Sequence, residues 1–303
     1  LGDLMPTLNG LFTGFLPKEL DAILPQQHTE GDTEPQVDRA DELRQKWGVE
    51  SGQMWQLGDH RIICGDCTDA AVVARVMGGE KAALCFTSPP YNAGKTPTEE
   101  KLGTERKYKD YSDDLTQDGY LDLLVGFTDI ALSVCEFTFV NLQMLSGNKL
   151  AILDYMTHYR MNLADIAIWD KQHAQPAMAE NVMNSRFEFL FAFSSASPAS
   201  RRLPGSFRGT VDNVYAGSPQ RTNDLGAKVH AATMPVDFAA WVVSSFTDGR
   251  AIAYEPFSGS GTTIIACENL GRKCRAVEIS AGYVAVAIER WATHTGGTPE
   301  LLP

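Results

Sequence analysis

The sequence has 303 residues, of which 44% are hydrophobic and 21% charged, and its formal net charge is −12. This length and composition fit one large globular domain or two smaller ones with a real core. No apolar run is long enough to cross a bilayer and we recognise no signal peptide, so we expect a cytoplasmic protein with no membrane partner. The acidity disfavours a nucleic-acid partner at first sight, although an acidic protein can bind a polyanion through a local basic surface.

Residues 1–52 form an acidic N-terminal extension or linker. We predict a short helix at 17–24, a linker at 26–36, and a second short helix at 38–47 that ends at Gly48. The extension carries no motif with recognisable chemistry, so we place the main domain at 53–303.

From residue 53 the sequence changes to alternating apolar and helical segments. In this first half we expect strands at 60–66, 82–86 and 149–153, helices at 69–79 and 118–135, and a polar, lysine-rich mobile loop at 93–112.

The second half continues the alternation. The segment 186–194 carries Phe187, Phe189, Phe191 and Phe193 at a spacing of two, which predicts a strand with an aromatic core face rather than a base-stacking row. An irregular segment follows at 195–228, and such long segments are usually functional or disordered. We then expect helices at 235–246, 262–270 and 281–294 and strands at 251–257 and 274–280. This order predicts an α/β fold with a doubly wound, mostly parallel sheet.

The six cysteines are scattered and several lie in apolar segments, which predicts buried thiols in a reducing compartment. Cys64 and Cys67 form a CxxC pair, but no second pair or histidine cluster accompanies them. We therefore interpret the pair as two residues flanking a tight turn and predict no metal site.

The stretch "TSPPYN" directly follows the predicted strand 82–86. Two prolines cannot continue a hydrogen-bonded ladder, so Pro89 and Pro90 fix a rigid turn after the strand. A stiff loop is one interpretation, and a loop that grips a ligand with Ser88 and Tyr91 is the other.

A second motif, "PFSGSGTT", joins the predicted strand 251–257 to the helix after it. Gly259 and Gly261 allow the backbone to turn tightly under a ligand, and the helix N-terminus at Thr262 can hold an anion. Glu278, at the tip of the next strand, can accept hydrogen bonds from ribose hydroxyls. A nicotinamide dinucleotide or S-adenosylmethionine fits this arrangement, but Ile264 stands where the dinucleotide fingerprint has its third glycine.

Together, "TSPPYN", "PFSGSGTT" and "GRKCRAVEIS" resemble the exocyclic-amine DNA methyltransferases, with the motif order of the permuted beta class. The resemblance covers about residues 53–293. It implies a Rossmann-like methyltransferase sheet with an irregular target-recognition insertion, and S-adenosylmethionine as cofactor. Two departures are Glu255, where aspartate is commoner, and Ala231, where the family often has proline.

The resemblance assigns roles residue by residue. The expected catalytic residues are Ser88, Pro89, Pro90 and Tyr91, which act on a base flipped out of the duplex. The expected cofactor-binding residues are Asp66, His230, Phe257, Gly259, Ser260, Gly261, Thr262, Thr263 and Glu278. The expected DNA-binding residues, drawn from the loop 93–112 and the segment 195–228, are Lys95, Lys107, Lys109, Arg201, Arg202, Arg208 and Arg221.

Serine before the two prolines favours cytosine N4 as the methylated atom, and adenine N6 is the alternative. Two further hypotheses are a DNA-binding relic without catalysis and a dinucleotide-dependent oxidoreductase. Double-stranded DNA is the expected partner. Permuted enzymes often dimerise, so we also expect a homodimer, and the resemblance leaves open a companion nuclease of a restriction–modification system.

Overall fold

A computed structural model describes residues 33–94, 113–175, 180–195, 198–203, 211–218 and 234–303. The predicted helix at 17–24 and nearly all of the predicted loop 93–112 lie outside these ranges.

The described residues form one ten-stranded sheet with the order β10-β1-β2-β9-β8-β3-β4-β6-β5-β7. Its strands are β1 (Met54–Leu57), β2 (His60–Cys64), β3 (Leu84–Thr87), β4 (Phe137–Leu142), β5 (Leu163–Gln175), β6 (Ser185–Ser194), β7 (Val214–Ala216), β8 (Ile252–Glu255), β9 (Lys273–Glu278) and β10 (Glu300–Leu302). The central five strands, from β2 to β4, pair in parallel. Antiparallel pairs join β1 to β2 and to β10 on one side, and β6 to β4 and to β5 on the other.

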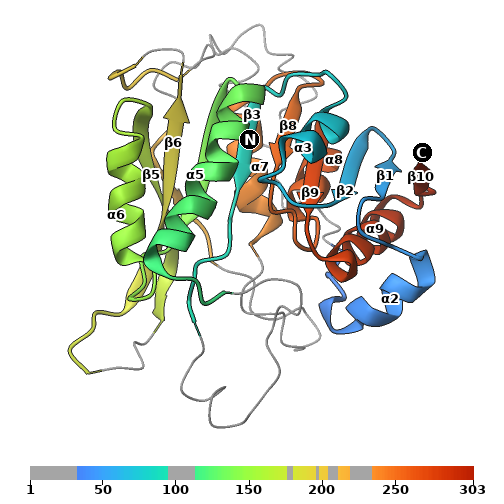
Figure 1. The fold of residues 1–303 in the computed structure, drawn as a ribbon, viewed down its shortest axis with the longest axis horizontal. Helices are drawn as coiled ribbons and strands as arrows, with labels where there is room; N and C mark the ends of the chain where they lie inside the picture. The colour runs from blue at the N-terminus through green and yellow to red at the C-terminus, as the bar shows by residue number, and fades with distance from the viewer. Residues whose placement is uncertain (1–32, 95–112, 176–179, 196–197, 204–210, 219–233) are drawn as a thin grey trace, which may run out of the picture.

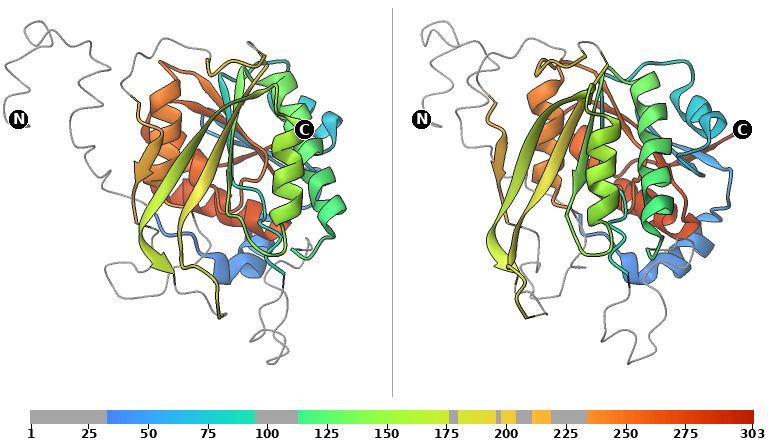
Figure 2. Two further views of the ribbon diagram at one scale, coloured as in Figure 1. Left: turned by 90° about the vertical axis from the view of Figure 1, so that its left-hand side faces the viewer. Right: turned by 60° about the vertical axis from the view of Figure 1, so that its left-hand side comes forward.

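Helices cover both faces of the sheet (Figures 1 and 2). The described helices are η2 (Val37–Arg39), α2 (Ala40–Trp47), α3 (Ala70–Met77), α5 (Gln117–Val134), α6 (Lys149–His158), α7 (Val236–Phe246), α8 (Thr262–Asn269) and α9 (Ala281–Thr295). Side chains of α3, α5 and α6 share one buried cluster with the sheet, and those of α7, α8 and α9 share the other. The predicted doubly wound, mostly parallel α/β fold is therefore confirmed. None of these helices has the length and apolar character needed to span a membrane.

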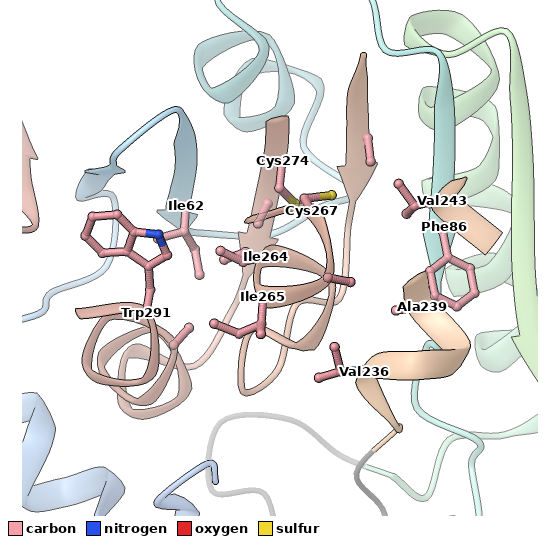
Figure 3. Close-up of a cluster of buried hydrophobic side chains, with 14 of the residues drawn as sticks. Ile62, Phe86, Val236, Ala239, Val243, Ile264, Ile265, Cys267, Cys274 and Trp291 are labelled. Carbon is pink, nitrogen blue, oxygen red and sulfur yellow. The ribbon is translucent and has the colours of Figure 1, made fainter. Parts of the chain in front are cut away.

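The core on the side of α7, α8 and α9 is built from small, branched and aromatic side chains (Figure 3). Ile62 from β2 and Phe86 from β3 are fully buried and belong to this cluster with Ile264 of α8 and Val243 of α7. Because both faces of the central strands are buried, these strands carry continuous apolar runs rather than alternating ones.

One sequence prediction is wrong: residues 149–153 form the first part of helix α6, not a strand. Ala151, Ile152 and Tyr155 are its buried side chains, and their spacing places them on one face of a helix that packs beside α5. The strand of this region is β4, all six of whose residues are buried. Sequence patterning alone does not distinguish such short apolar runs.

The aromatic strand is confirmed as β6, and its phenylalanines share one face. Phe191 and Phe193 are fully buried in the core, as expected, whereas Phe187 is 43% exposed at the other end of the strand. The segment 195–228 includes the short strand β7, which pairs in parallel with β5. The strands β1, β4, β7 and β10 were not predicted.

The end of the acidic extension packs onto the main domain. Helix α2 lies against α9, its Leu43 is fully buried, and Lys46 and Trp47 donate hydrogen bonds to the Glu289 carboxylate. Helix α2 ends at Gly48, as predicted, and this glycine is in the left-handed region. Residues 37–49 are thus continuous with the core of the domain.

This packing predicts a stability cost for a substitution in the extension. We expect Leu43→Ala to lower the free energy of unfolding by about 2–5 kcal/mol, because it opens a cavity against α9. Urea unfolding followed by circular dichroism measures the change, and the exposed Glu50→Ala is the control. A Leu43→Ala protein as stable as the control would mean that the extension is not part of the core.

Candidate active site

The two sequence motifs meet at one edge of the sheet. Strand β3 pairs in parallel with β8, with Cys85 opposite Tyr254, so the loops that leave the carboxyl ends of these strands are neighbours. The helix after β8 lies on one face of the sheet and the helix after β3 on the other. Connections that diverge in this way leave a crevice above the two strand ends, where α/β proteins bind their ligands.

The loop Ser88–Asn92 is held in place by hydrogen bonds from three other segments. Tyr120 donates to the Pro90 carbonyl over 2.7 Å, and Asn148 donates to the Tyr91 carbonyl over 2.6 Å. Asn92 has φ of 54° and its side chain bonds the backbone of Leu115. No donor among the described residues reaches the Pro89 carbonyl. The loop is rigid, and one of its carbonyls is left available.

The Tyr91 hydroxyl lies in a polar cluster next to Ser88. It is 3.0 Å from Ser88 Oγ and donates to Glu188 of β6 over 2.6 Å. Asn141 of β4 donates to the same Glu188 oxygen. Burial, followed by the charge of Glu188, raises the pKa of Tyr91 well above its ordinary value, so the phenol keeps its proton.

The glycine turn between β8 and α8 requires its glycines. Gly259 and Gly261 have φ of 51° and 81°, a region that other residues rarely adopt. A Cβ on Gly261 would also lie 2.9 Å from the Cβ of Ala287 on α9. Helix α8 starts at Thr262 without a side-chain cap, so backbone N–H groups of its first turn stay available for an anion.

Glu278 closes the other side of this turn. Its carboxylate accepts hydrogen bonds from Gly259 N and Ser280 N, each over 2.8 Å. Strand β2 lies beside β9, and Gly65 N donates to the Glu278 carbonyl. Asp66, exposed two residues after β2, is therefore close in the fold to the glycine turn and to Glu278.

Glu255, the residue that departs from the commoner aspartate, joins the two motifs directly. Its buried carboxylate accepts hydrogen bonds from the hydroxyl of Thr87, at the end of β3, and from Phe257 N. It also accepts from Thr263 Oγ1 in the first turn of α8, over 2.8 Å. Burial raises the pKa of Glu255 to about 8, although these hydrogen bonds oppose the shift. Phe257, the next aromatic residue of the motif, packs edge-on against Phe127 of α5.

A buried arginine supports the glycine turn from the side of α9. Arg290 is 2% exposed and donates to the Ser260 carbonyl and to Thr262 Oγ1. Its Nε also donates to the Thr33 carbonyl over 2.8 Å, so the acidic extension reaches the back of the turn. Arg290 was not predicted from the sequence.

The two predicted DNA contacts that the structure describes, Arg201 and Arg202, do not lie at this edge. Arg201 pairs with Asp165 near the start of β5. Across β6, Asp165 is aligned with Phe139 of β4, two residues before Asn141. Arg202, beside Arg201, is exposed. The other predicted binding residues lie outside the described residues: Lys95, Lys107, Lys109, Arg208, Arg221 and His230.

Three nearly fully buried polar residues near the loop Ser88–Asn92 were also not predicted from the sequence, namely Asn141, Lys171 and Glu188. A signal for Glu188 was present, because it alternates with the core phenylalanines of β6 and so lies on the opposite face of the strand. The CxxC cysteines, Cys64 and Cys67, are free and buried, as are the other four. Among the described residues, no group of three or more His, Cys, Asp or Glu side chains is placed to hold a metal ion.

Comparison with known proteins identifies the family. Residues 82–289, well over half of the chain, match the DNA methylase family, whose members act on N6 or N4 amines. The chain belongs to this family.

Two characterised relatives are type II methyltransferases. The methyltransferase M.HpaI of Haemophilus parainfluenzae is 21% identical over 250 residues, which cover 79% of this chain and 76% of that protein. M.SmaI of Serratia marcescens is 28% identical over 139 residues, which cover 41% of this chain but only 44% of the relative.

Solved structures share the fold at low sequence identity. The PvuII DNA methyltransferase, described as cytosine-N4-specific, gives a TM-score of 0.57 at 16% identity and covers 78% of this chain and 87% of its own. A DNA modification methylase of Thermus thermophilus, solved with S-adenosyl-L-methionine, gives 0.51 at 19% identity and covers 79% and 96%. These likenesses support the Rossmann-like methyltransferase fold.

The raised pKa of Glu255 predicts a pH-dependent stability. Between the ordinary carboxyl value of 4.5 and about 8, the folded protein holds a proton that the unfolded chain has lost. Folding is therefore favoured below this window, and this contribution is lost as the pH rises towards 8, by at most about 1.4 kcal/mol per pH unit. In Glu255→Gln the side chain at position 255 keeps nearly the same shape but cannot titrate. We therefore expect the stability of this variant relative to wild type to rise with pH.

Urea unfolding of both proteins at several pH values, from about 5.5 to about 8, measures the difference. Glu80→Gln is the matched control, because hydrogen bonds from Arg275 lower the pKa of Glu80 against the effect of burial. Its stability difference from wild type should be constant across this range. A constant difference for Glu255→Gln as well would contradict the prediction.

Proposed function

We propose that this protein transfers a methyl group from S-adenosylmethionine to the exocyclic amine of a base flipped out of double-stranded DNA. The observation that carries the proposal is the pairing of β3 with β8, which makes the Ser88–Tyr91 loop and the glycine turn neighbours at one crevice. Methyl donor and acceptor need such a shared cavity, because much of the rate gain in transfer comes from orientation.

The cofactor fits the residues around the glycine turn. The uncapped first turn of α8, at Thr262 and Thr263, can bind the cofactor carboxylate. This helix directly follows the tight turn through Gly259, Ser260 and Gly261. Glu278 and Asp66 are acceptors for the ribose and adenine of the cofactor, and Phe257 offers an apolar wall. When bound, S-adenosylmethionine supplies an electrophilic sulfonium methyl group.

The residues of the loop Ser88–Asn92, the proline loop, act on the amine. The nitrogen lone pair of a base amine is delocalised into the ring, so it is a weak nucleophile. Ser88 Oγ and the Pro89 carbonyl accept hydrogen bonds from the two amine hydrogens, which makes the nitrogen more tetrahedral and frees the lone pair. Pro89 and Pro90 keep these acceptors fixed before the substrate arrives. The ring of Tyr91 stacks on the flipped base, which stabilises binding by about 1–3 kcal/mol.

We propose cytosine N4 as the methylated atom. Serine before the two prolines favours cytosine in this family, and the PvuII enzyme, which shares the fold, is described as cytosine-N4-specific. Adenine N6 is the alternative. The lysines of 93–112 and the arginines of 195–228 are the proposed DNA contacts. Double-stranded DNA is the proposed substrate, a homodimer the proposed assembly and the cytoplasm the proposed location of the protein.

Radiolabelled methyl transfer tests the proposal. The protein is incubated with tritiated S-adenosylmethionine and mixed-sequence DNA, and the DNA is digested to nucleosides and separated. We expect label in N4-methylcytosine. Label in N6-methyladenine would overturn the choice of base, and unlabelled DNA from folded protein would overturn the proposed activity.

Ser88→Ala tests the acceptor role. Loss of one hydrogen bond at the reacting amine, about 1–3 kcal/mol, is expected to lower kcat by roughly 10- to 100-fold. The Kd for S-adenosylmethionine, measured by calorimetry, should not change, because Ser88 lies on the other motif. Ser133→Ala, on the exposed last turn of α5, is the control and should retain full kcat. An active Ser88→Ala protein would exclude the serine as an acceptor.

A further inference from the structure

A buried ion pair lies beside the Ser88–Tyr91 loop. Lys171 and Glu188 are only 3% and 6% exposed, and Lys171 Nζ is 2.7 Å from Glu188 Oε1. Burying two charges costs free energy that their attraction offsets only with good geometry and further hydrogen bonds. Here the second carboxylate oxygen, Oε2, accepts from Tyr91 and Asn141, each over 2.6 Å.

Three neighbouring strands place these groups on one face of the sheet. Glu188 of β6 is opposite Trp169 of β5, and Asn141 of β4 is opposite Leu190, two residues further along β6. Strand β5 is irregular after Asp170, where Gln172 has φ of 62°. Lys171 sits in this irregularity, where it reaches Glu188 rather than solvent.

The chemistry of the groups fixes the direction of each hydrogen bond. A carboxylate only accepts, so the single phenolic proton of Tyr91 is directed to Glu188. The Tyr91 oxygen can then only accept from Ser88, whose Oγ is 3.0 Å away. Ser88 therefore uses its hydrogen on Tyr91, and the lone pairs of its Oγ remain for the substrate.

The same carboxylate orients Asn141. Its Nδ2 must face Glu188, because two acceptors would otherwise face one another. The second hydrogen of Nδ2 is directed to the Tyr91 oxygen at 2.5 Å, since Ser88 Oγ is further away at 3.5 Å. This leaves Asn141 Oδ1 fully buried, and no donor among the described residues reaches it. The cluster consequently presents acceptors, and no spare hydrogen, on the side of Ser88.

We propose that Glu188, neutralised by Lys171, is a positioning residue that holds the Ser88 hydroxyl with its lone pairs directed to the target amine. The inference rests on the proposed function and deepens it, since it names what sets the orientation of the serine. A serine without this chain of bonds is free to rotate and to point its own hydrogen at the amine, which would oppose the reaction.

Glu188→Gln tests the direction of the chain. If the new amide kept its oxygen on Tyr91, its NH2 group would face the Lys171 ammonium, donor against donor. The amide therefore turns its NH2 group to Tyr91 and to Asn141, whose own amide must turn over so that Oδ1 accepts. Tyr91 no longer has a carboxylate to donate to, so it donates to Ser88 Oγ and occupies a lone pair. We expect kcat for methyl transfer to fall about 10- to 100-fold, with the Kd values for S-adenosylmethionine and DNA within about twofold of wild type.

A double-mutant cycle with Tyr91→Phe distinguishes positioning from a merely structural role. Removing the phenol oxygen disconnects Ser88 from Glu188. In the Tyr91→Phe background, Glu188→Gln should therefore lower kcat by less than about twofold further. Two losses that multiply would overturn the proposal, as would a Glu188→Gln protein with wild-type kcat.

Two further variants guard against loss of folding. Lys171→Met/Glu188→Met removes both charges together, so no buried charge is left unpaired, and it should fold but show the same loss of kcat. Glu80→Gln, which breaks the ion pair with the buried Arg275 elsewhere in the sheet, should lose stability but keep kcat. A fully active double-methionine variant would overturn the proposal. Failure of the proposed function is distinct, because wild-type protein itself would then transfer no methyl group to DNA.

Discussion

The carboxylate of Glu255 is the contact on which the arrangement of the site depends. Three donors from three segments converge on it, namely Thr87 at the end of β3, Phe257 after β8, and Thr263 at the start of α8. Thr87 and Glu255 are 168 positions apart in the chain, yet they lie on adjacent parallel strands. The carboxylate therefore fixes the position of the proline loop relative to the glycine turn. It thereby sets the separation of the proposed methyl donor and acceptor sites.

The site uses buried acids mainly to orient donors. Glu278 fixes the backbone at Gly259 and Ser280, Glu255 fixes two threonines, and Glu188 fixes Tyr91 and Asn141. Glu188 has a cation, Lys171, within ion-pair distance. Glu255 instead has its pKa raised to about 8 by burial, so part of the protein population carries it neutral near physiological pH. These two acids thus reach low net charge by different means, one by pairing and one by protonation.

Sequence reasoning succeeded where a motif specifies its own local geometry. The glycine turn, the proline loop and the strands that lead into them follow from residues next to one another in the chain. It failed where tertiary packing decides: "KLAIL" is a helix because α5 offers a surface for one face of it, and the buried strand β4 has no alternation to mark it. Glu188 was missed because the aromatic face of β6 dominated the pattern, although the same alternation places the glutamate on the reverse face.

The acidic extension has a physical connection to the site that its composition does not suggest. Arg290 donates to Thr33 of the extension and also to Ser260 and Thr262 of the glycine turn. A buried guanidinium with several carbonyl and hydroxyl acceptors is rigid, because losing any of them leaves a charged donor unsatisfied. The extension therefore completes the acceptor set that keeps Arg290 behind the turn, in addition to covering α9 through α2. The acidic residues of α2 are on the outside of this contact, whereas Leu43 faces inward, so the charge and the packing of the extension serve separate purposes.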